Sequence, residues 1–285
     1  MATVGVIVHP ERELAAELAR DAAAWLADRG HEVRLPVKDA GIIGQSELGV
    51  PEALFARGLD VVVSLGGDGT MLRTVDLVAA DGVPVIGVNV GQLGYLTEVE
   101  PHGLRMALKR FLAGAYEVEE RMMLQIDVDS DGVDVGTRHL ALNEAVLEKT
   151  PVGHTVRLGV SVNGEFFTPY AADGLIVATP TGSTAYAFSA RGPIVAPSHR
   201  CLLLTPVSPH MLFDRSLVLD AGSHVRIDVI GTRPATLSVD GRNLTTLHER
   251  DSITCTAAPG AARLVMFGHR DFLKILKTKF GLSDR

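Results

Sequence analysis

The feature that most constrains the fold is an apolar run at residues 60–65 (DVVVSL) that passes directly into the glycine-rich segment 66–70 (GGDGT). A short β-branched run that ends in glycines is typical of a buried strand, and residues 71–80 after it have the composition of a helix. The same alternation surrounds this segment, with strands predicted at 4–8, 31–35 and 83–88 and a helix at 11–28. Strands that alternate with helices indicate a parallel, doubly wound sheet.

The part of the chain after about residue 116 has a different sequence pattern. Its apolar runs are short and are separated by glycine, aspartate or proline, and they lie at 124–128, 140–147, 156–162, 217–219, 225–229 and 235–239. Short strands at this spacing are typical of an antiparallel sandwich or barrel. We therefore predict an α/β domain over 1–115 and a mostly antiparallel β-sandwich domain over 116–270. A terminal helix within 271–285 is expected to pack back on the first domain.

The overall composition excludes some classes of function. The 285-residue chain has a net charge of −7, and 46% of its residues are hydrophobic. This apolar content supplies a sizeable core, and the acidic charge argues against a nucleic-acid-binding protein, which normally carries a basic stripe. The amino terminus (MATVGVIVHP) does not resemble a signal peptide, and no apolar run is long enough to span a bilayer. We therefore expect a soluble, cytoplasmic protein.

The glycine-rich segment is the first candidate for chemistry, because ligands of an open α/β sheet bind beyond the carboxyl ends of its strands. Gly66, Gly67 and Gly69 let a phosphate approach the backbone, and free N–H groups at a helix start favour an anion. Asp68 would repel a phosphate, so it suits a general base or a partner for a hydroxyl or magnesium. The alternative is a tight turn in which Asp68 caps the helix. The sequence has neither a Walker A loop nor a Rossmann glycine fingerprint.

Two further segments carry polar groups that suit a nucleotide. In 89–97 (NVGQLGYLT), Tyr95 could stack on a base, or it could fill the space between domains. Asn143 and Glu144 could hold ribose hydroxyls or an amide edge, although a solvated strand end is the better explanation of these two residues taken alone.

A fourth segment, 173–186, is the densest in small polar residues. A buried strand ends there in a Thr-Pro-Thr-Gly turn, after which Ser183 or Thr184 can cap the helix that follows. Hydroxyls and free N–H groups converge in this way at anion and nucleotide sites. A merely structural turn is a weak account of such a composition.

Together these segments resemble the NAD kinase family across nearly the whole chain. The matching stretches are GGDGT (66–70), NVGQLGYLT (89–97), LNEAVLEK (142–149), DGLIVATPTGSTAYAFSA (173–190), LTPVSPH (204–210) and SVDGR (238–242). GGDGT alone is shared with a wider superfamily that includes diacylglycerol and sphingosine kinases, whereas the combination is far more specific.

The resemblance implies phosphorylation of the 2′-hydroxyl of the adenosine ribose of NAD to give NADP, with ATP or polyphosphate as donor. Asp68 would be the proton acceptor, and a phosphate loop would be formed by Gly66, Gly67, Gly69 and Thr70. NAD-binding roles are implied for Asp68, Gly69, Arg73, Tyr95, Asn143, Glu144, Asp173, Thr184, Ala185, Tyr186 and Ser189. Asp240 and Arg242 are further candidates, although many relatives carry glutamine at the position of Arg242.

Magnesium is expected to arrive with the nucleoside triphosphate, because the sequence shows no dedicated set of metal ligands. The resemblance also implies a homodimer or homotetramer, with no nucleic-acid or membrane partner.

One position departs from the family pattern. Arg191 stands where the family has the first glycine of Gly-Gly-Pro. If that position needs a positive φ, arginine strains the backbone; if it does not, Arg191 could add a phosphate contact. The lysines of the terminal segment, Lys274, Lys277 and Lys279, could also face a phosphate, although a solvated helix face is the simpler explanation.

Two other functions are compatible with parts of the sequence. A lipid or sugar kinase could share the GGDGT fold, but this acidic chain offers no obvious membrane-docking surface. A sensor could bind NAD or NADP without turnover, although the presence of Asp68 argues against it.

Overall fold

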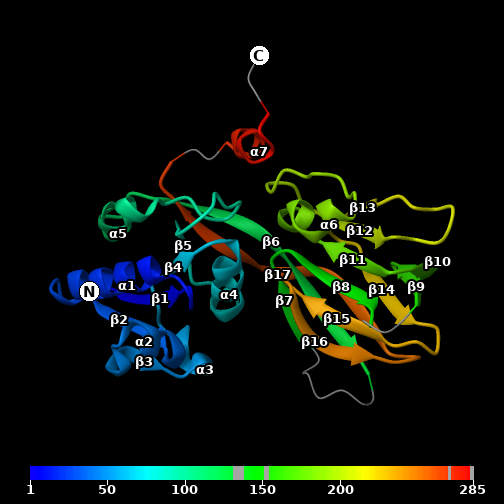
Figure 1. The fold of residues 1–285 in the computed structure, drawn as a ribbon, viewed down its shortest axis with the longest axis horizontal. Helices are drawn as coiled ribbons and strands as arrows, with labels where there is room; N and C mark the ends of the chain where they lie inside the picture. Colours follow the sequence, from blue (N-terminus) through cyan, green and yellow to red (C-terminus); the bar gives the residue numbers. More distant parts are fainter. Residues whose placement is uncertain (131–137, 151–153, 269–270, 283–285) are drawn as a thin grey trace. The chain divides into compact units, whose positions relative to one another are not determined.

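The computed structural model describes residues 1–130, 138–150, 154–268 and 271–282 (Figure 1). The chain forms two compact units: unit 1 contains residues 1–120 and 262–285, and unit 2 contains residues 121–261. Two strands, β6 (Glu117–Asp129) and β17 (Ser252–Met266), carry the chain from one unit into the other. Unit 1 is therefore assembled from two separate stretches of sequence.

A parallel sheet forms the centre of unit 1. Its strand order is β3-β2-β1-β4-β5, and the strands are β1 (Thr3–Val8), β2 (Glu32–Pro36), β3 (Gly49–Val50), β4 (Val61–Gly66) and β5 (Val85–Asn89). The last part of β17 extends the sheet in parallel, where Leu264 pairs with Val85. Every residue of β4 is buried, as expected for a strand with both faces covered. The predicted parallel sheet is confirmed.

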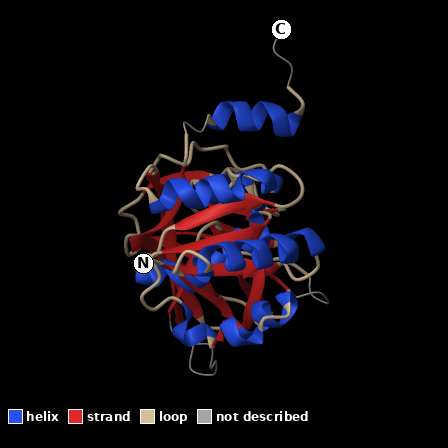
Figure 2. Cartoon of the chain, turned by 90° about the vertical axis from the view of Figure 1, so that its left-hand side faces the viewer, coloured by secondary structure: helices blue, strands red, loops and turns tan. Residues whose placement is uncertain are grey.

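Helices cover both faces of this sheet, and they account for most of the helical structure seen in Figure 2. They are α1 (Glu13–Ala27), α2 (Val37–Ile43), α3 (Glu52–Phe55), α4 (Asp68–Val78) and α5 (Leu104–Leu112). A further helix of this unit, α7 (Phe272–Phe280), has no buried residue. Val4 and Val6 of β1 belong to the same core cluster as the buried alanines of α1. Between them, Gly5 faces the opposite way, because a Cβ there would touch Phe55 and Leu59. The sheet is therefore doubly wound.

Unit 2 consists of antiparallel strands in two sheets. One sheet contains β9 (Val156–Val162), β10 (Glu165–Ala172), β14 (Val225–Val229), part of β17, and the pair of β6 with β7 (Arg138–Ala141). The other has the order β13-β12-β11-β8-β15-β16, from Leu217–Asp220, Cys201–Val207, Gly174–Ala178, Glu144–Lys149, Ala235–Val239 and Arg242–Leu247. One apolar cluster holds Leu158 and Ile227 of the first sheet with Leu147 and Leu204 of the second. The predicted antiparallel sandwich is thus confirmed.

Some elements differ from the prediction. The run 140–147 is not one strand: β7 ends at Ala141 and β8 begins at Glu144. The helices α2 and α3 were not predicted, because with 7 and 4 residues they are too short to show helical periodicity. No helix within the described residues is long and apolar enough to cross a membrane.

Candidate functional site

Asp68 is the first residue of α4, directly beyond the carboxyl end of β4. Its carboxylate accepts hydrogen bonds from the N–H groups of Tyr95, at 2.8 Å, and Leu96, at 3.0 Å. The residue at the N-cap position is Gly67, which has no side chain to cap the helix. The interpretation of Asp68 as a helix cap is therefore wrong, because its carboxylate holds the loop after β5 instead.

The glycines around Asp68 have different steric roles. A Cβ on Gly66 would overlap the hydroxyl of Thr70, and a Cβ on Gly94 would overlap the Asp68 carboxylate. A Cβ on Gly67 or Gly69 would meet no heavy atom within 4 Å. Gly66 and Gly94 therefore allow close packing around Asp68, whereas the other two leave space on the side where a ligand can approach.

A pocket of about 620 Å³ opens beside Asp68. Its lining brings the glycine-rich segment together with cationic side chains, among them Arg12, Gly67, Asp68, Gly69, Arg73 and Lys279. Asp68 is the only carboxylate among the lining residues in the described part of the chain. The combination of a glycine-rich helix start with cations suits a phosphate chain, with one carboxylate available for a proton.

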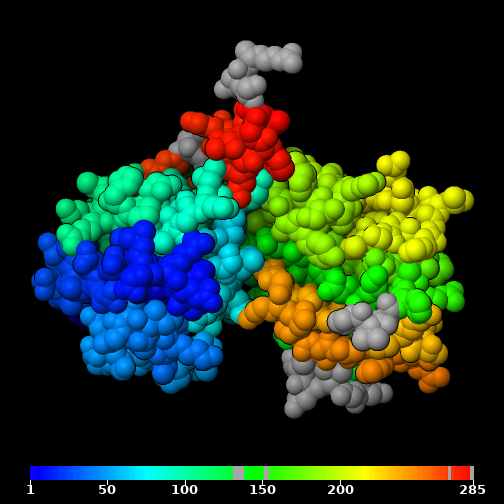
Figure 3. Space-filling view, viewed as in Figure 1, coloured from blue at the N-terminus to red at the C-terminus, as the bar shows by residue number. Residues whose placement is uncertain are grey.

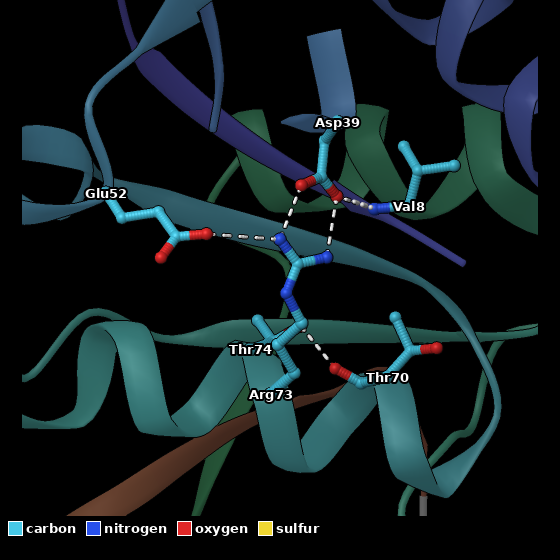
Figure 4. A network of polar contacts seen from close by, with 6 residues as sticks. All are labelled: Val8, Asp39, Glu52, Thr70, Arg73 and Thr74. Atoms are coloured by element: carbon cyan, nitrogen blue, oxygen red, sulfur yellow. Dashed lines mark hydrogen bonds and ion pairs between the residues drawn. The ribbon is translucent and has the colours of Figure 1, made fainter. Parts of the chain in front are cut away.

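Arg73 of α4 lies on the wall of this pocket but is already engaged with carboxylates. Figure 4 shows its guanidinium turned toward Asp39 and Glu52. Its two Nη atoms contact the two carboxylate oxygens of Asp39, at 3.0 and 2.5 Å, and one lies 3.6 Å from Glu52. Asp39 is fully buried and also accepts the N–H of Val8 at 2.8 Å. Arg73 therefore ties α2 to α4 and to the end of β1.

Tyr95 lies in the loop that Asp68 holds. The ammonium group of Lys279, in α7 (red in Figure 3), lies over the Tyr95 ring, 4.0 Å from its centroid. Burial, reinforced by the charge of Asp68, raises the pKa of Tyr95 above its ordinary value. The ring is therefore available for stacking, but one face of it carries a cation in this structure.

In unit 2, two of the predicted segments, Asn143-Glu144 and 238–242 (SVDGR), form one cluster. Asp240 and Gly241 make the two-residue turn between β15 and β16, with φ angles of 47° and 77°. This is the Asp-Gly pattern of a type I′ hairpin. The Asp240 carboxylate accepts the N–H groups of Leu142, Asn143 and Glu144 at 2.7, 2.8 and 3.0 Å. Asp240 therefore shapes the segment between β7 and β8.

Glu144 is buried, with 5% of its surface exposed. Burial, reinforced by the charge of Asp240 and opposed by a hydrogen bond from the Tyr186 backbone, raises the pKa of Glu144 to about 8. Its Oε2 is buried without a hydrogen-bond partner. The interpretation of this residue as part of a solvated strand end is therefore wrong, because Glu144 lies inside the unit. One of its oxygens is still able to bond a ligand.

The turn after β11 packs directly on this cluster. A Cβ on Gly182 would overlap the carbonyl of Asn143, and the Thr179 hydroxyl donates to the carbonyl of Leu142 at 2.5 Å. Neither Ser183 nor Thr184 caps the following helix α6 (Tyr186–Ser189). The Ser183 hydroxyl exchanges hydrogen bonds with the backbone of Val195, and that of Thr184 donates to a carbonyl in its own turn. The predicted cap is therefore wrong, although the predicted turn is present.

Carboxylates surround Tyr186, the first residue of α6. Its pKa is raised by burial and then by the charges of Glu148, Asp173 and Glu144. Asp173 accepts a hydrogen bond from the Lys149 ammonium at 2.8 Å. The predicted residues Asn143, Glu144, Asp173, Thr184, Ala185, Tyr186 and Asp240 thus lie in one region of unit 2. Ser189 and Arg242 are exposed at the end of α6 and the start of β16.

Arg191 has a φ of 66°. The first of the two alternatives for this position therefore holds: arginine occupies a left-handed conformation that favours glycine.

Arg12 and Asp39 are polar residues of the site that the sequence analysis did not name. Arg12 lines the Asp68 pocket, and Asp39 binds Arg73. Arg12 follows the carboxyl end of β1, so the rule that ligands bind at that edge could have indicated it. Asp39 gave no such signal, because a single aspartate within a short helix is indistinguishable from a surface residue. Within the described residues, no group of three or more His, Cys, Asp or Glu side chains could hold a metal ion.

Comparison with known proteins gives a consistent result. The ATP-NAD kinase N-terminal domain family matches residues 4–116, and the ATP-NAD kinase C-terminal domain family matches residues 142–267. The chain is 43% identical over 281 residues to an NAD kinase of Heliobacterium modesticaldum, covering 98% of each chain. It is 40% identical over 280 residues to an NAD kinase of Symbiobacterium thermophilum, covering 98% of this chain and 99% of the relative.

Solved structures agree with these sequence matches. Yeast NADH kinase complexed with NADH superposes with a TM-score of 0.92 at 26% identity, covering 100% of this chain and 89% of that chain. An NAD kinase from Archaeoglobus fulgidus in complex with ATP superposes with a TM-score of 0.73 at 25% identity, covering 98% and 97%. The matched domains, the identities and the shared fold together show that this chain is an enzyme of the NAD kinase family.

Proposed function

We propose that the protein transfers the γ-phosphoryl group of ATP, or a terminal phosphoryl group of polyphosphate, to the 2′-hydroxyl of the adenosine ribose of NAD. The observation that carries this proposal is the position of Asp68. Its carboxylate is fixed by two backbone N–H groups at the edge of a pocket that also contains a glycine-rich helix start and cations. A fixed carboxylate beside a phosphate site suits a general base.

The chemistry assigned to Asp68 is proton transfer. In the proposed step, a ribose oxygen attacks the terminal phosphorus and gives its proton to the Asp68 carboxylate. The bond from that phosphorus to the bridging oxygen breaks, and ADP, or the polyphosphate shortened by one unit, leaves with the electron pair. Positioning and charge neutralisation provide most of the rate enhancement in such reactions. Magnesium bound to the donor phosphates would supply part of that neutralisation. Among the described residues that line the pocket, Asp68 is the one carboxylate that could contribute to its coordination.

The residues proposed to bind the dinucleotide have matching chemistry. In unit 2, the free Oε2 of Glu144 and the side chains of Asn143 and Asp173 offer acceptors and donors for ribose hydroxyls or an amide. In unit 1, the proposal assigns the same role to Asp68, Gly69 and Tyr95. The relatives' ligands support this assignment, since one neighbour was solved with NADH and another with ATP.

The test is NADP formation by the purified protein from NAD, ATP and magnesium, beside the Asp68→Asn variant. Loss of the general base should lower kcat by roughly 10²–10⁴-fold. Asp76→Asn, at an exposed position on the same helix, is the matched control and should retain activity. Polyphosphate as donor and NADH as acceptor are tested in parallel. Measurable NAD binding without product from any of these pairs would refute the kinase and favour a sensor.

The assembly and location of the protein are further proposals from family resemblance. We propose a cytoplasmic homodimer or homotetramer. Sedimentation equilibrium of the purified protein would distinguish these two assemblies, and a monomer at micromolar concentration would contradict both.

A further inference from the structure

Arg12 lies just before α1 and has an unusual environment for an arginine. Its Nη1 is buried without a hydrogen-bond partner. Among the described residues, no carboxylate forms an ion pair with its guanidinium. Burying a cation without an acceptor is costly, so such a group usually has a partner that is present only in the working protein.

The guanidinium is held in place by the loop after β5. A Cβ added to Gly91 would overlap its Nη1, and Gly91 has a φ of 139°, which favours glycine. Both Arg12 and Gly91 line the pocket that contains Asp68. The chain therefore keeps the smallest residue at a strained position where the guanidinium lies against the backbone.

The other cations of the pocket are already engaged. Arg73 makes two hydrogen bonds to the buried carboxylate of Asp39, and Lys279 lies over the ring of Tyr95. Of the two arginines that line the pocket, Arg73 is paired with a carboxylate, and Arg12 has no carboxylate partner among the described residues. A guanidinium binds phosphate through parallel N–H donors, which a lysine cannot reproduce.

We propose that Arg12 binds the phosphate chain of the phosphoryl donor and is a further substrate-binding residue of this enzyme. This inference rests on the proposed function, because it takes the Asp68 pocket as the place where donor phosphates bind. It assigns the donor rather than the pyrophosphate of NAD, because Arg12 shares its pocket with the glycine-rich helix start at Gly67 and Gly69, which suits a phosphate chain.

The experiment compares Arg12→Met and Arg12→Lys with the wild type. Arg12→Met keeps the length of the side chain and removes its charge, so we expect the KM for ATP to rise on the order of 10- to 100-fold while the KM for NAD stays within about twofold. Arg12→Lys should give a smaller rise, because it keeps the charge and loses the two parallel donors. Arg20→Met, in the helix α1 that follows Arg12 and with 38% of its side chain exposed, is the matched control and should leave both constants unchanged.

Calorimetric titration with magnesium-ATP, tripolyphosphate and orthophosphate, in the absence of NAD, gives a readout independent of turnover. Weaker binding of ATP and tripolyphosphate to Arg12→Met would support the proposal, even if the wild type made no NADP and the proposed function failed. Unchanged donor binding, or a rise in the KM for NAD alone, would overturn it. Circular dichroism and the Tm of each variant separate these results from misfolding, and Arg12→Lys provides the comparison if Arg12→Met does not fold.

Discussion

Asp68 in unit 1 and Asp240 in unit 2 stabilise their surroundings in the same way. Each carboxylate accepts backbone N–H groups from a segment distant in sequence: Asp68 from residues 95 and 96, and Asp240 from residues 142–144. Each thereby fixes the shape of a loop that carries other predicted site residues. Geometry alone does not distinguish these two aspartates.

Their electrostatic surroundings are opposite. The pocket beside Asp68 is lined by Arg12, Arg73 and Lys279. In unit 2, burial together with the charge of Asp240 raises the pKa of Glu144, and the charges of nearby carboxylates add to burial in raising the pKa of Tyr186. The cationic site suits phosphates, whereas the acidic site suits hydroxyls, amides or a positively charged ring. Asp68, in the cationic site, can therefore accept a proton from a reacting hydroxyl. Asp240, in the acidic site, mainly positions the backbone.

The largest expected effect concerns the acidic site and its dependence on pH. The pKa of Glu144 is about 8 in the folded protein, above its ordinary value of 4.5. The neutral carboxyl therefore favours folding at low pH, and this contribution is lost as pH rises from about 4.5 toward 8. Relative to Glu144→Gln, the wild type should lose about 2–4 kcal/mol of unfolding free energy between about pH 5 and pH 8.

Urea denaturation at several pH values measures this difference. Glu165→Gln, an exposed residue of β10, is the matched control. If the unfolding free energies of the wild type and Glu144→Gln changed equally with pH across this range, Glu144 would not be held neutral.

The next effect concerns the cationic site. Gly94→Ala should displace the Asp68 carboxylate, because the new Cβ would overlap it. Misplacing a catalytic group by about 1 Å can cost on the order of 100-fold in kcat. Steady-state NADP formation measures the loss, and Gly41→Ala, where a Cβ meets open space, is the control. Full activity in Gly94→Ala would show that catalysis does not depend on the position in which Asp68 is held.

Asp240→Asn tests the positioning role in unit 2. The amide would present its NH₂ group to a backbone N–H, so we expect the unfolding free energy to fall by about 1–3 kcal/mol. Asp220→Asn keeps an oxygen that can accept the exposed N–H of Gly222, so it should change the stability by less than about 0.5 kcal/mol. Equal effects of the two substitutions in chemical denaturation would contradict the role assigned to Asp240.

The smallest effect concerns Arg191. Replacing it with glycine should relieve the left-handed backbone and raise the unfolding free energy by roughly 0.5–1 kcal/mol. Thermal denaturation measures the gain, and Arg200→Gly, an exposed residue without a positive φ, should give none. A loss of stability in Arg191→Gly would show that the arginine makes a contact that outweighs the strain.

The main strands could be predicted from the sequence because their signals are local, whereas the roles of the site residues came from the family resemblance and stay predictions. The strand β4 is a continuous apolar run that ends in glycine, and the Asp-Gly pair before Arg242 carries its own turn preference. The break between β7 and β8 could not be predicted from the local sequence, because Asp240, which binds the backbone there, lies 98 residues beyond Leu142. The same reason explains Ser183, whose hydroxyl bonds Val195 rather than its own helix.

The role of Arg73 was also beyond the sequence. The family resemblance implied an NAD-binding role for it, but Asp39, 34 residues earlier in the chain, accepts hydrogen bonds from both of its Nη atoms. Partners that meet only after folding cannot be inferred from either residue alone. Polar networks were therefore less predictable than hydrophobic patterns in this chain.

The division of unit 1 into two stretches of sequence has a consequence for the order of folding during synthesis. Unit 2 is continuous from residue 121 to residue 261, so the ribosome completes it before residues 262–285 exist. Until then, Val85 of β5 lacks its partner Leu264. An open sheet edge is a template for wrong pairing, and in the growing chain this edge waits for the last part of β17.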